Sequence, residues 1–287
     1  MEETSDRMLQ SNFNLTNYDF YSSRHEMELV ANIVDSLNKI IAEDRKEKQP
    51  LFLRTTNNFL FDIAKRVVHD KKKTFLIGIA GESASGKTTF VDNTVKACVK
   101  EKKEGIYTVI RCDDYFYDTS KELIDAGSYE ALFKTGFSFD TPKAVNLDLM
   151  KQHLIELKQG NTVVSPNYDF VTCVSKSDGE VKKPAKVILN EGLYVLNEDL
   201  REIMDIRVYV FTPIDVIKDR WYNRAATRGK TGEAADMMFA DVNHTAQRYI
   251  RPAMEISDVI INGMVAVDYI EVITDKIFNA IAEACEI

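Results

Sequence analysis

The stretch from Thr74 to Val91, TFLIGIAGESASGKTTFV, constrains this 287-residue chain more than any other. Its first part, Phe75 to Ala80, is a short apolar run that predicts a buried parallel strand. Gly81 to Thr88 follows as GESASGKT and fits G-x-x-x-x-G-K-[ST] at every fixed position. The residues after the loop, TTFVDNTVKACVK, are compatible with a helix. A strand, a glycine-rich loop and a helix in this order predict a P-loop.

The chemistry of this loop explains its spacing. Gly81 and Gly86 allow a tight turn whose backbone N–H groups point inward, and the N-terminus of the following helix favours anions. Lys87 supplies a mobile cation for the outer phosphates, and the Thr88 hydroxyl can hold Mg²⁺. The sequence therefore predicts a nucleoside triphosphate site. The residues predicted to bind it are Gly81, Glu82, Ser83, Ala84, Ser85, Gly86, Lys87, Thr88 and Thr89.

Composition excludes several other classes of protein. The formal net charge of −8 and the pI near 5.2 argue against a surface that coats nucleic acid. No run approaches the roughly 18 apolar residues of a membrane span. The acidic start MEETSDRM lacks the basic and apolar regions of a signal peptide. We therefore expect a cytoplasmic protein with no nucleic-acid or membrane partner.

The cysteines and histidines show no spacing typical of a disulfide framework or a zinc site. They are Cys98, Cys112, Cys173, Cys285, His25, His69, His153 and His244. We expect the cysteines to be reduced thiols and the histidines to be surface or packing residues.

The chain before the P-loop unit is expected to be helical. Residues 1–22 predict a loosely packed lead-in. From Arg24 to Glu43, apolar residues recur at three- and four-residue steps, which predicts an amphipathic helix. Leu53 to Val68 offers a second helix, and Asp70 to Lys73 predicts a solvated linker before the first strand.

The predicted domain organisation follows from this pattern. Residues 1–70 are predicted to be a helical N-terminal extension, and residues 71–287 a P-loop domain that holds the nucleotide site, with the extension outside this unit. The extension could cover the sheet, make a dimer contact or bind a partner, and the sequence leaves these alternatives open, including self-association into a homo-oligomer.

Strands and helices alternate through the rest of the chain, which predicts an α/β fold with a parallel sheet flanked by helices. Further strands are expected at Tyr107–Arg111, Lys186–Gly192, Ile206–Phe211 and Asp258–Ile261, and helices at Ala144–Leu157, Asp215–Arg228 and Asp268–Ala284. Thr162 to Val164 and Asn167 to Val171 predict a strand and a turn, and Ser177 to Glu180 predicts a hairpin turn, so a small antiparallel flap is expected. No element is predicted from Lys121 to Phe139.

Acidic residues follow two of these strands. Open α/β sheets bind ligands at the carboxyl ends of their strands, and Tyr107–Arg111 is followed directly by CDDYFY. Asp113 and Asp114 are adjacent, so in a strand their side chains would point to opposite faces and only one could easily act as a base. Glu191 ends another strand and is placed to be the second acid beside Mg²⁺.

A basic helix is predicted to form a lid. Arg220, Arg224 and Arg228 recur at four-residue steps and therefore share one helix face. They lead into Gly229–Gly232, a flexible basic loop. This arrangement suits a lid that closes over phosphates.

Several motifs together resemble the uridine kinase and phosphoribulokinase family, with the closest likeness to uridine–cytidine kinases. They are GESASGKTT, DDYFYD, FDTPKAVNLDLM, PNYDFVT, VILNEGLYVL, the arginine-rich lid ending RGK, and YIRPAMEISDVIING. The P-loop occurs in many NTPases, whereas this ordered combination is far more specific. The likeness runs from about Lys73 to the C-terminus. It implies an ATP- and Mg²⁺-dependent kinase that phosphorylates a hydroxyl of a small molecule, a nucleoside.

The resemblance also implies roles for individual residues. Asp113 would accept the proton of the nucleoside 5′-hydroxyl, and the other catalytic residues implied are Lys87, Arg220 and Arg228. Arg224 and Lys230 would contact the nucleotide, although the register around Arg224 is open because the family arginine could align with Asn223. The implied metal site is Thr88 and Glu191. The implied acceptor site is Phe116, Asp140, Tyr168 and Cys173.

One departure from the family pattern leaves the acceptor open. The family continues Y-D-F with a histidine and an arginine, where this chain has Cys173 and Ser175, and a thiol is a much weaker hydrogen-bond partner than an imidazole. A phosphoribulokinase-like or other sugar kinase is therefore an alternative. A nucleotide-binding regulatory protein without transfer activity is another. No N-K-x-D guanine-reading motif is present, although the sequence does not decide between ATP and GTP as donor.

Overall fold

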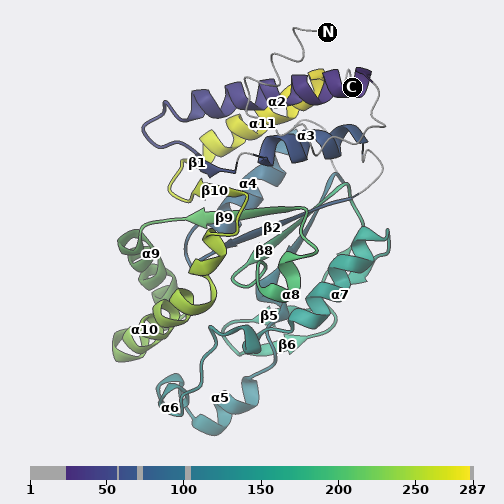
Figure 1. Cartoon of the computed structure of the whole chain (residues 1–287). Helices are drawn as coiled ribbons and strands as arrows, with labels where there is room; N and C mark the ends of the chain where they lie inside the picture. The colour runs from purple at the N-terminus through teal and green to yellow at the C-terminus, as the bar shows by residue number, and fades with distance from the viewer. Residues whose placement is uncertain (1–23, 57, 70–73, 101–104, 285–287) are drawn as a thin grey trace.

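The computed structural model describes residues 24–56, 58–69, 74–100 and 105–284. The predicted lead-in of residues 1–22 and the predicted linker at Asp70–Lys73 lie outside these residues. Within the described chain, a central sheet carries helices on both of its faces (Figure 1).

The central sheet has the strand order β1-β10-β9-β2-β8-β3. Its strands are β1 (Phe52–Thr55), β2 (Phe75–Gly81), β3 (Tyr107–Arg111), β8 (Val187–Gly192), β9 (Ile206–Phe211) and β10 (Val259–Asn262). All neighbours pair in parallel except β1, which runs antiparallel to β10. The predicted parallel sheet flanked by helices is confirmed, with one antiparallel strand added at its edge.

Strand β1 corrects the sequence-based prediction for this region. A helix was expected over Leu53–Val68, but Phe52–Thr55 is a strand and helix α3 begins only at Phe59 (Phe59–His69). The physical reason is long-range pairing. The backbone groups of β10 would otherwise form an open sheet edge, and β1 satisfies them.

One face of the sheet is covered by four helices: α2 (Arg24–Asp44), α3, α4 (Lys87–Lys100) and α11 (Val267–Ala284). Helix α2 confirms the predicted amphipathic helix, and it lies beside α11 (Figure 1). Its buried residues, which include Ile33 and Leu37, belong to the same hydrophobic cluster as Ile79, Val208 and Ile261 of the sheet. Residues on both sides of the predicted boundary at residue 70 thus share one core, and the boundary itself stays a prediction.

The opposite face packs against α7 (Leu147–Lys158), α8 (Glu198–Arg201) and the 3₁₀ turns η2 (Cys112–Tyr115) and η4 (Arg251–Met254). Two short helices, α5 (Ser120–Ala126) and α6 (Tyr129–Lys134), and the 3₁₀ turn η3 (Pro142–Ala144) occupy a region with little regular pattern. One local signal for α6 was available, because the Ser128 hydroxyl caps it by accepting from the Ala131 N–H.

The predicted flap is present as two antiparallel ladders. Strand β4 (Val163–Val164) pairs with β7 (Val181–Lys182), and β5 (Asn167–Asp169) pairs with β6 (Val174–Lys176). The chain reverses between β5 and β6, so the hairpin turn predicted at Ser177–Glu180 was placed wrongly. Cys173 closes the reversal with a φ of 58°, and its N–H donates a hydrogen bond to the Asp169 carbonyl over 2.8 Å.

Helices α9 (Ile214–Thr227) and α10 (Gly232–Tyr249) project from one side of the sheet (Figure 1). They pack together through Trp221, Ala225, Met238 and Val242. Helix α9 confirms the predicted basic helix. Helix α10, which follows the predicted loop at Gly229–Gly232, had no counterpart in the sequence-based prediction.

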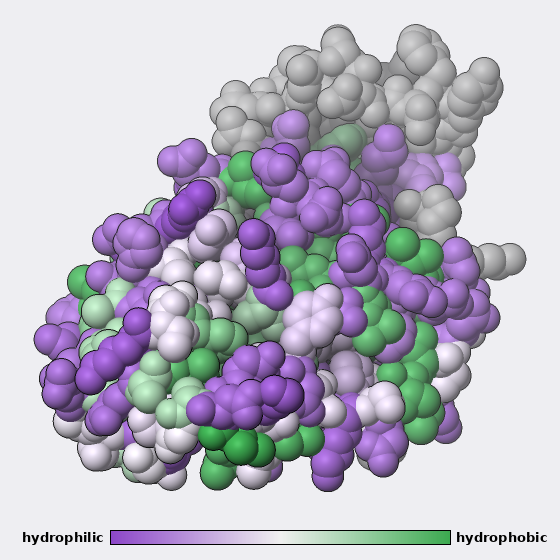
Figure 2. All heavy atoms as spheres, turned by 90° about the horizontal axis from the view of Figure 1, so that it is seen from below, coloured by the Kyte–Doolittle hydropathy of each residue, from purple (hydrophilic) through white to green (hydrophobic). Residues whose placement is uncertain are grey.

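The surface is mostly hydrophilic on the face that Figure 2 shows, with smaller groups of hydrophobic side chains between the charged ones. No helix in the described residues is long and apolar enough to cross a membrane.

Ile33 of α2 is fully buried in the core that α2 shares with the sheet, so it tests whether this core is shared. We expect Ile33→Ala to lower the free energy of unfolding of the whole chain by about 2–5 kcal/mol, because it removes buried apolar contacts and leaves a cavity. Urea unfolding followed by circular dichroism measures this. Asn38→Ala, an exposed control on the same helix, should change it by less than about 0.5 kcal/mol. An unchanged midpoint for Ile33→Ala would contradict the shared core.

Candidate active site

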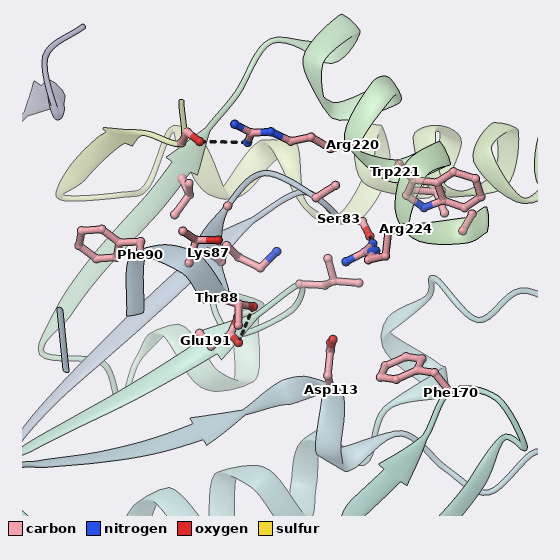
Figure 3. Close-up of a pocket in the computed structure, with 18 of the residues that line it drawn as sticks. Ser83, Lys87, Thr88, Phe90, Asp113, Phe170, Glu191, Arg220, Trp221 and Arg224 are labelled. Carbon is pink, nitrogen blue, oxygen red and sulfur yellow. Dashed lines mark hydrogen bonds between the residues drawn. The ribbon is translucent and has the colours of Figure 1, made fainter. Parts of the chain in front are cut away.

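A cavity of about 540 Å³ opens at the carboxyl ends of the parallel strands (Figure 3). Its walls come from the P-loop, from η2, from the flap, from helices α9 and α10, and from the connection between β10 and α11. This is the edge of the sheet at which open α/β folds bind ligands.

The P-loop is seated against the ends of two neighbouring strands. The Thr212 hydroxyl, just after β9, donates to the Ser85 carbonyl over 2.8 Å. Gly263, just after β10, lies so close that a Cβ atom there would be 2.0 Å from the same carbonyl oxygen. Only glycine fits this position. Gly86 faces Gly263 with a φ of 102°, a conformation that a side chain would strain.

Lys87 bonds to its own loop. Its ammonium group donates to the Glu82 carbonyl over 2.9 Å. Burial lowers the pKa of this ammonium below its ordinary value, and the carboxylates of Glu191 and Asp113 oppose the effect. A buried cation held by a carbonyl is a group that phosphate oxygens would satisfy better.

Thr88 and Glu191 meet beside the P-loop. The Thr88 hydroxyl donates to Glu191 Oε1 over 3.0 Å, the bond dashed in Figure 3, and Arg111 Nη1 lies 3.0 Å from the same oxygen. Burial raises the pKa of Glu191, and Lys87 opposes this.

A hydroxyl and a carboxylate side by side are oxygen ligands of the kind that Mg²⁺ takes, so Thr88 and Glu191 fit that ion. The described residues contain no cluster of three or more His, Cys, Asp or Glu side chains that could hold a metal on its own.

Asp113 and Asp114 lie in the 3₁₀ turn η2, because β3 ends at Arg111. The expectation of alternating strand faces therefore gave the wrong reason for separating them. Only Asp113 lines the cavity, and Figure 3 shows its carboxylate pointing inward. Burial raises the pKa of Asp114 to about 6, partly offset by Lys182.

Aromatic side chains line the end of the cavity away from the P-loop. The rings of Phe116, Tyr168 and Phe170 pack with centroids 5.0–5.7 Å apart. Cys173 is buried beside them, with its Sγ 3.3 Å from the Tyr129 hydroxyl. The structure thus brings three predicted acceptor residues together and adds Phe170 to the cavity lining.

Asp140 forms part of the same wall. Burial raises the pKa of its carboxyl group to about 7, and the nearby carboxylates of Asp241 and Asp113 add to the rise. Asp241 of α10 accepts a hydrogen bond from the Ser138 hydroxyl, which in turn accepts from the Asp140 N–H. The segment that carries Asp140 is therefore tied to the α9–α10 pair.

The cations of the α9 face point to the cavity, as does Lys230. Arg220 donates to the Gly263 carbonyl over 3.0 Å, and Arg224 donates to the Ser83 hydroxyl. Arg228 lies 4.5 Å from the Phe170 ring centroid, and Lys230 lies 4.2 Å from that of Tyr129. All four cations line the cavity, so this wall of it carries positive charge.

Residues 76–269 match the Phosphoribulokinase / Uridine kinase family. The chain belongs to this family. It is a phosphotransferase with an alcohol group as acceptor, as the motifs predicted.

Two similar proteins illustrate the relationship. A uridine kinase of Macrococcus caseolyticus is 32% identical over 216 residues, which cover 73% of this chain and 98% of that protein. A uridine kinase of Proteus mirabilis is 31% identical over 205 residues, which cover 68% and 92% respectively. The solved structure of a possible uridine kinase from Bacillus stearothermophilus has a TM-score of 0.44 and 17% identity over 80% of this chain and 97% of that one.

Most residues that the sequence predicts for the site of this kinase line the one cavity. They are Ser83, Ala84, Gly86, Lys87, Thr88, Thr89, Asp113, Phe116, Asp140, Tyr168, Cys173, Glu191, Arg220, Arg224, Arg228 and Lys230. Their roles in binding and catalysis stay predictions.

Gly81, Glu82 and Ser85 do not line the cavity. Gly81 ends β2, and the Ser85 carbonyl seats the loop. The Glu82 carboxylate accepts two hydrogen bonds from the Arg251 guanidinium of η4, at 3.0 and 2.9 Å, in a bidentate arrangement. Glu82 therefore anchors the P-loop to a distant turn.

Sequence reasoning missed the apolar end of the cavity beside the P-loop. Phe90, Val210, Ile261, Val265 and Ile270 line it. The motif YIRPAMEISDVIING carried part of the signal, because it includes Ile261 and Gly263, but its pattern did not indicate which side chains face a ligand.

Asp140 makes the stability of this kinase depend on pH. Because its folded pKa is raised from 3.8 to about 7, the folded state binds more protons than the unfolded state between these values. Stability contributed by the protonated carboxyl is fully present below about pH 4 and is lost as pH rises through about 7.

We therefore expect Asp140→Asn to be more stable than the wild type at pH 8 and to lose less stability between pH 5 and pH 8. Urea unfolding at several pH values measures this. Asp178→Asn, at an exposed position, should keep the slope of the wild type. A wild-type slope in Asp140→Asn would show that another group titrates.

Proposed function

We propose that the chain is an ATP- and Mg²⁺-dependent kinase that transfers the γ-phosphate to a hydroxyl of a uridine- or cytidine-like nucleoside. The observation that supports this most is that one cavity has the P-loop at one end, an aromatic wall with Asp140 at the other, and Asp113 in its lining. The relatives named uridine kinase support the choice of a nucleoside.

The donor would lie along the P-loop. The loop amides hold phosphate oxygens, and Lys87 leaves the Glu82 carbonyl to bind the outer phosphates. Thr88 and Glu191 would hold Mg²⁺, which would neutralise charge on the phosphates. Arg220, Arg224, Arg228 and Lys230 offset charge that develops on the transferred group.

Asp113 would act on the acceptor. Its carboxylate is exposed to the cavity and lies near Lys87, so a hydroxyl between them would be oriented by the carboxylate and could lose its proton to it. Closure of the α9–α10 pair excludes water, which would otherwise compete as acceptor.

The aromatic wall would bind the rest of the acceptor. Phe116, Tyr168 and Phe170 present ring faces and edges suited to a flat base. Asp140, whose carboxyl group has a pKa of about 7, can accept hydrogen bonds from sugar hydroxyls.

A second candidate acceptor is a sugar or other hydroxylated metabolite, as in a phosphoribulokinase-like enzyme. The enclosure of Cys173 favours it. The thiol contacts the Tyr129 hydroxyl, so it offers little hydrogen bonding to a base edge. A regulatory protein without transfer activity is the remaining alternative.

A phosphate-transfer assay decides among these. The purified chain is given Mg²⁺ with ATP or GTP and a panel of pyrimidine and purine nucleosides, pentoses and pentose phosphates. We expect transfer from ATP to uridine or cytidine. Transfer to a pentose alone would contradict the nucleoside proposal. Nucleotide binding without any transfer would favour a regulatory protein without transfer activity.

Asp113→Asn should lower acceptor turnover by roughly 10²–10⁴-fold, because the amide keeps the shape of the side chain and removes the proton acceptor. ATP affinity, measured by calorimetry, should stay near that of the wild type. Asp114→Asn is the matched control and should retain turnover, since Asp114 does not line the cavity. The opposite pattern would move the base to Asp114.

Cys173→His should improve the use of uridine or cytidine, because an imidazole can bond to a base edge that the thiol cannot. Histidine tolerates the positive φ of this position better than most residues. The readout is kcat/KM for each nucleoside, with Cys173→Ala as the control that adds no donor. A gain in Cys173→Ala alone would indicate a steric effect instead.

A further inference from the structure

Residues 251–270, here called the corner segment, connect η4 through β10 to the start of α11. Its residues Ile261, Val265 and Ile270 line the cavity beside the P-loop. Gly263 touches the Ser85 carbonyl, and Arg251 holds the Glu82 carboxylate with two bonds. The position of the corner segment therefore sets both the wall of the cavity and the seat of the P-loop.

The corner segment is held on its outer side by residues that precede the P-loop. Strand β1 pairs with β10, so that Phe52 lies opposite Ile261 and Thr55 opposite Val259. The Asn262 N–H donates to the Leu51 carbonyl over 2.9 Å, and the Thr56 N–H donates to the Asp258 carbonyl over 2.9 Å. Without β1, β10 would be an open edge.

Arg54 reaches from β1 to η4. Its Nη2 donates to the Met254 carbonyl over 2.5 Å and lies 3.3 Å from the Ser257 carbonyl. Arg251 belongs to the same turn and, besides Glu82, also donates to Asn243 of α10 over 2.7 Å. A continuous set of contacts thus runs from Arg54 through η4 and Arg251 to the P-loop.

Asp44 provides a second connection. Its carboxylate, at the end of α2, is 1% exposed. It accepts from the N–H groups of Leu51 and Phe52, each over 2.8 Å, and from the Tyr269 hydroxyl over 3.0 Å. Tyr269 precedes Ile270, which lines the cavity. Asp44 therefore joins the start of β1 to the end of the corner segment.

We propose that residues 24–69 are a positioning element for the donor nucleotide, acting through Arg54 and Asp44 on the corner segment. These residues precede the match to the family, which begins at residue 76, and none of them lines the cavity. The inference rests on the proposed function, in which the nucleotide occupies the P-loop end. It gives the extension a role inside the catalytic unit, where the sequence predicted none.

The contacts predict a selective effect. The extension contacts the corner segment, on the P-loop side of the cavity. The aromatic acceptor wall is built instead from Phe116, the flap, Phe139 and Asp140. Loosening the corner segment should weaken nucleotide binding and leave the acceptor KM unchanged. A purely structural contact would lower stability without this selectivity.

The test compares two arginines of the extension. Arg54 bonds to the corner segment, whereas Arg66 of α3 bonds to Asp205 over 2.6 Å, away from the cavity. Binding of ATP with Mg²⁺ is measured by calorimetry at a temperature where every variant is folded. We expect Arg54→Ala to raise the dissociation constant of ATP roughly 2- to 30-fold. Arg66→Ala should lower the thermal midpoint but leave the dissociation constant as in the wild type.

Two further single variants keep the test decisive if Arg54→Ala folds poorly, and a double variant tests the connection through η4 where it folds. Arg54→Lys should restore part of the affinity, and Tyr269→Phe, which removes only the hydroxyl that bonds to Asp44, should weaken ATP binding in the same direction. The double variant Arg54→Ala with Glu82→Gln should lose less affinity than the two single losses combined, because both act through η4.

Equal ATP affinity in the wild type, Arg54→Ala and Tyr269→Phe would overturn the inference, as would an equal loss in Arg54→Ala and Arg66→Ala. Either result would leave the proposed function intact as long as the wild type binds ATP. Failure of the wild type itself to bind ATP would overturn both.

Discussion

The seat of the P-loop on the ends of β9 and β10 is the contact on which the rest of the site depends. The Ser85 carbonyl accepts from Thr212 and faces Gly263 with no room for a Cβ atom between them. Because these two strands neighbour each other and β9 pairs with β2, the loop cannot shift without moving the sheet. Lys87 and Thr88 follow the loop directly, and Glu191 enters from β8, so the seat also sets where phosphate and metal ligands would lie.

Charge in the cavity is arranged at a cost to stability. Lys87 is buried and bonds a carbonyl, while Arg220 and Arg224 bond neutral oxygens, so their positive charge is left for a ligand. Burial and neighbouring carboxylates raise the pKa of the Asp140 carboxyl group to about 7. Groups of this kind lower the stability of the fold and are typical of functional sites. An anionic ligand would offset the positive charge of Lys87, Arg220 and Arg224.

The residues before the family match share the sheet and the hydrophobic core of the matched region. The family match begins at residue 76, yet β1 completes the central sheet and α2 shares its core. Asp44 and Arg54 reach the two ends of the segment that forms one wall of the cavity. Strand β1 is thereby the edge strand of the sheet, and its hydrogen bonds to β10 fix the segment beneath the P-loop.

The sequence by itself determined the features that rest on local pattern. The P-loop, the strand at Tyr107–Arg111 and the basic helix with Arg220, Arg224 and Arg228 follow from spacing and periodicity. Side chains of the P-loop and the three arginines do line one cavity. The tertiary structure alone decided that Phe52–Thr55 is a strand, that Asp113 and Asp114 sit in a 3₁₀ turn, and that Glu82 pairs with Arg251. The strand and the Glu82–Arg251 pair depend on partners far along the chain, as does the bond from Arg54 to Met254, 200 residues away. No local pattern encodes such a partner, because its energy is gained only once the sheet has brought the two segments together.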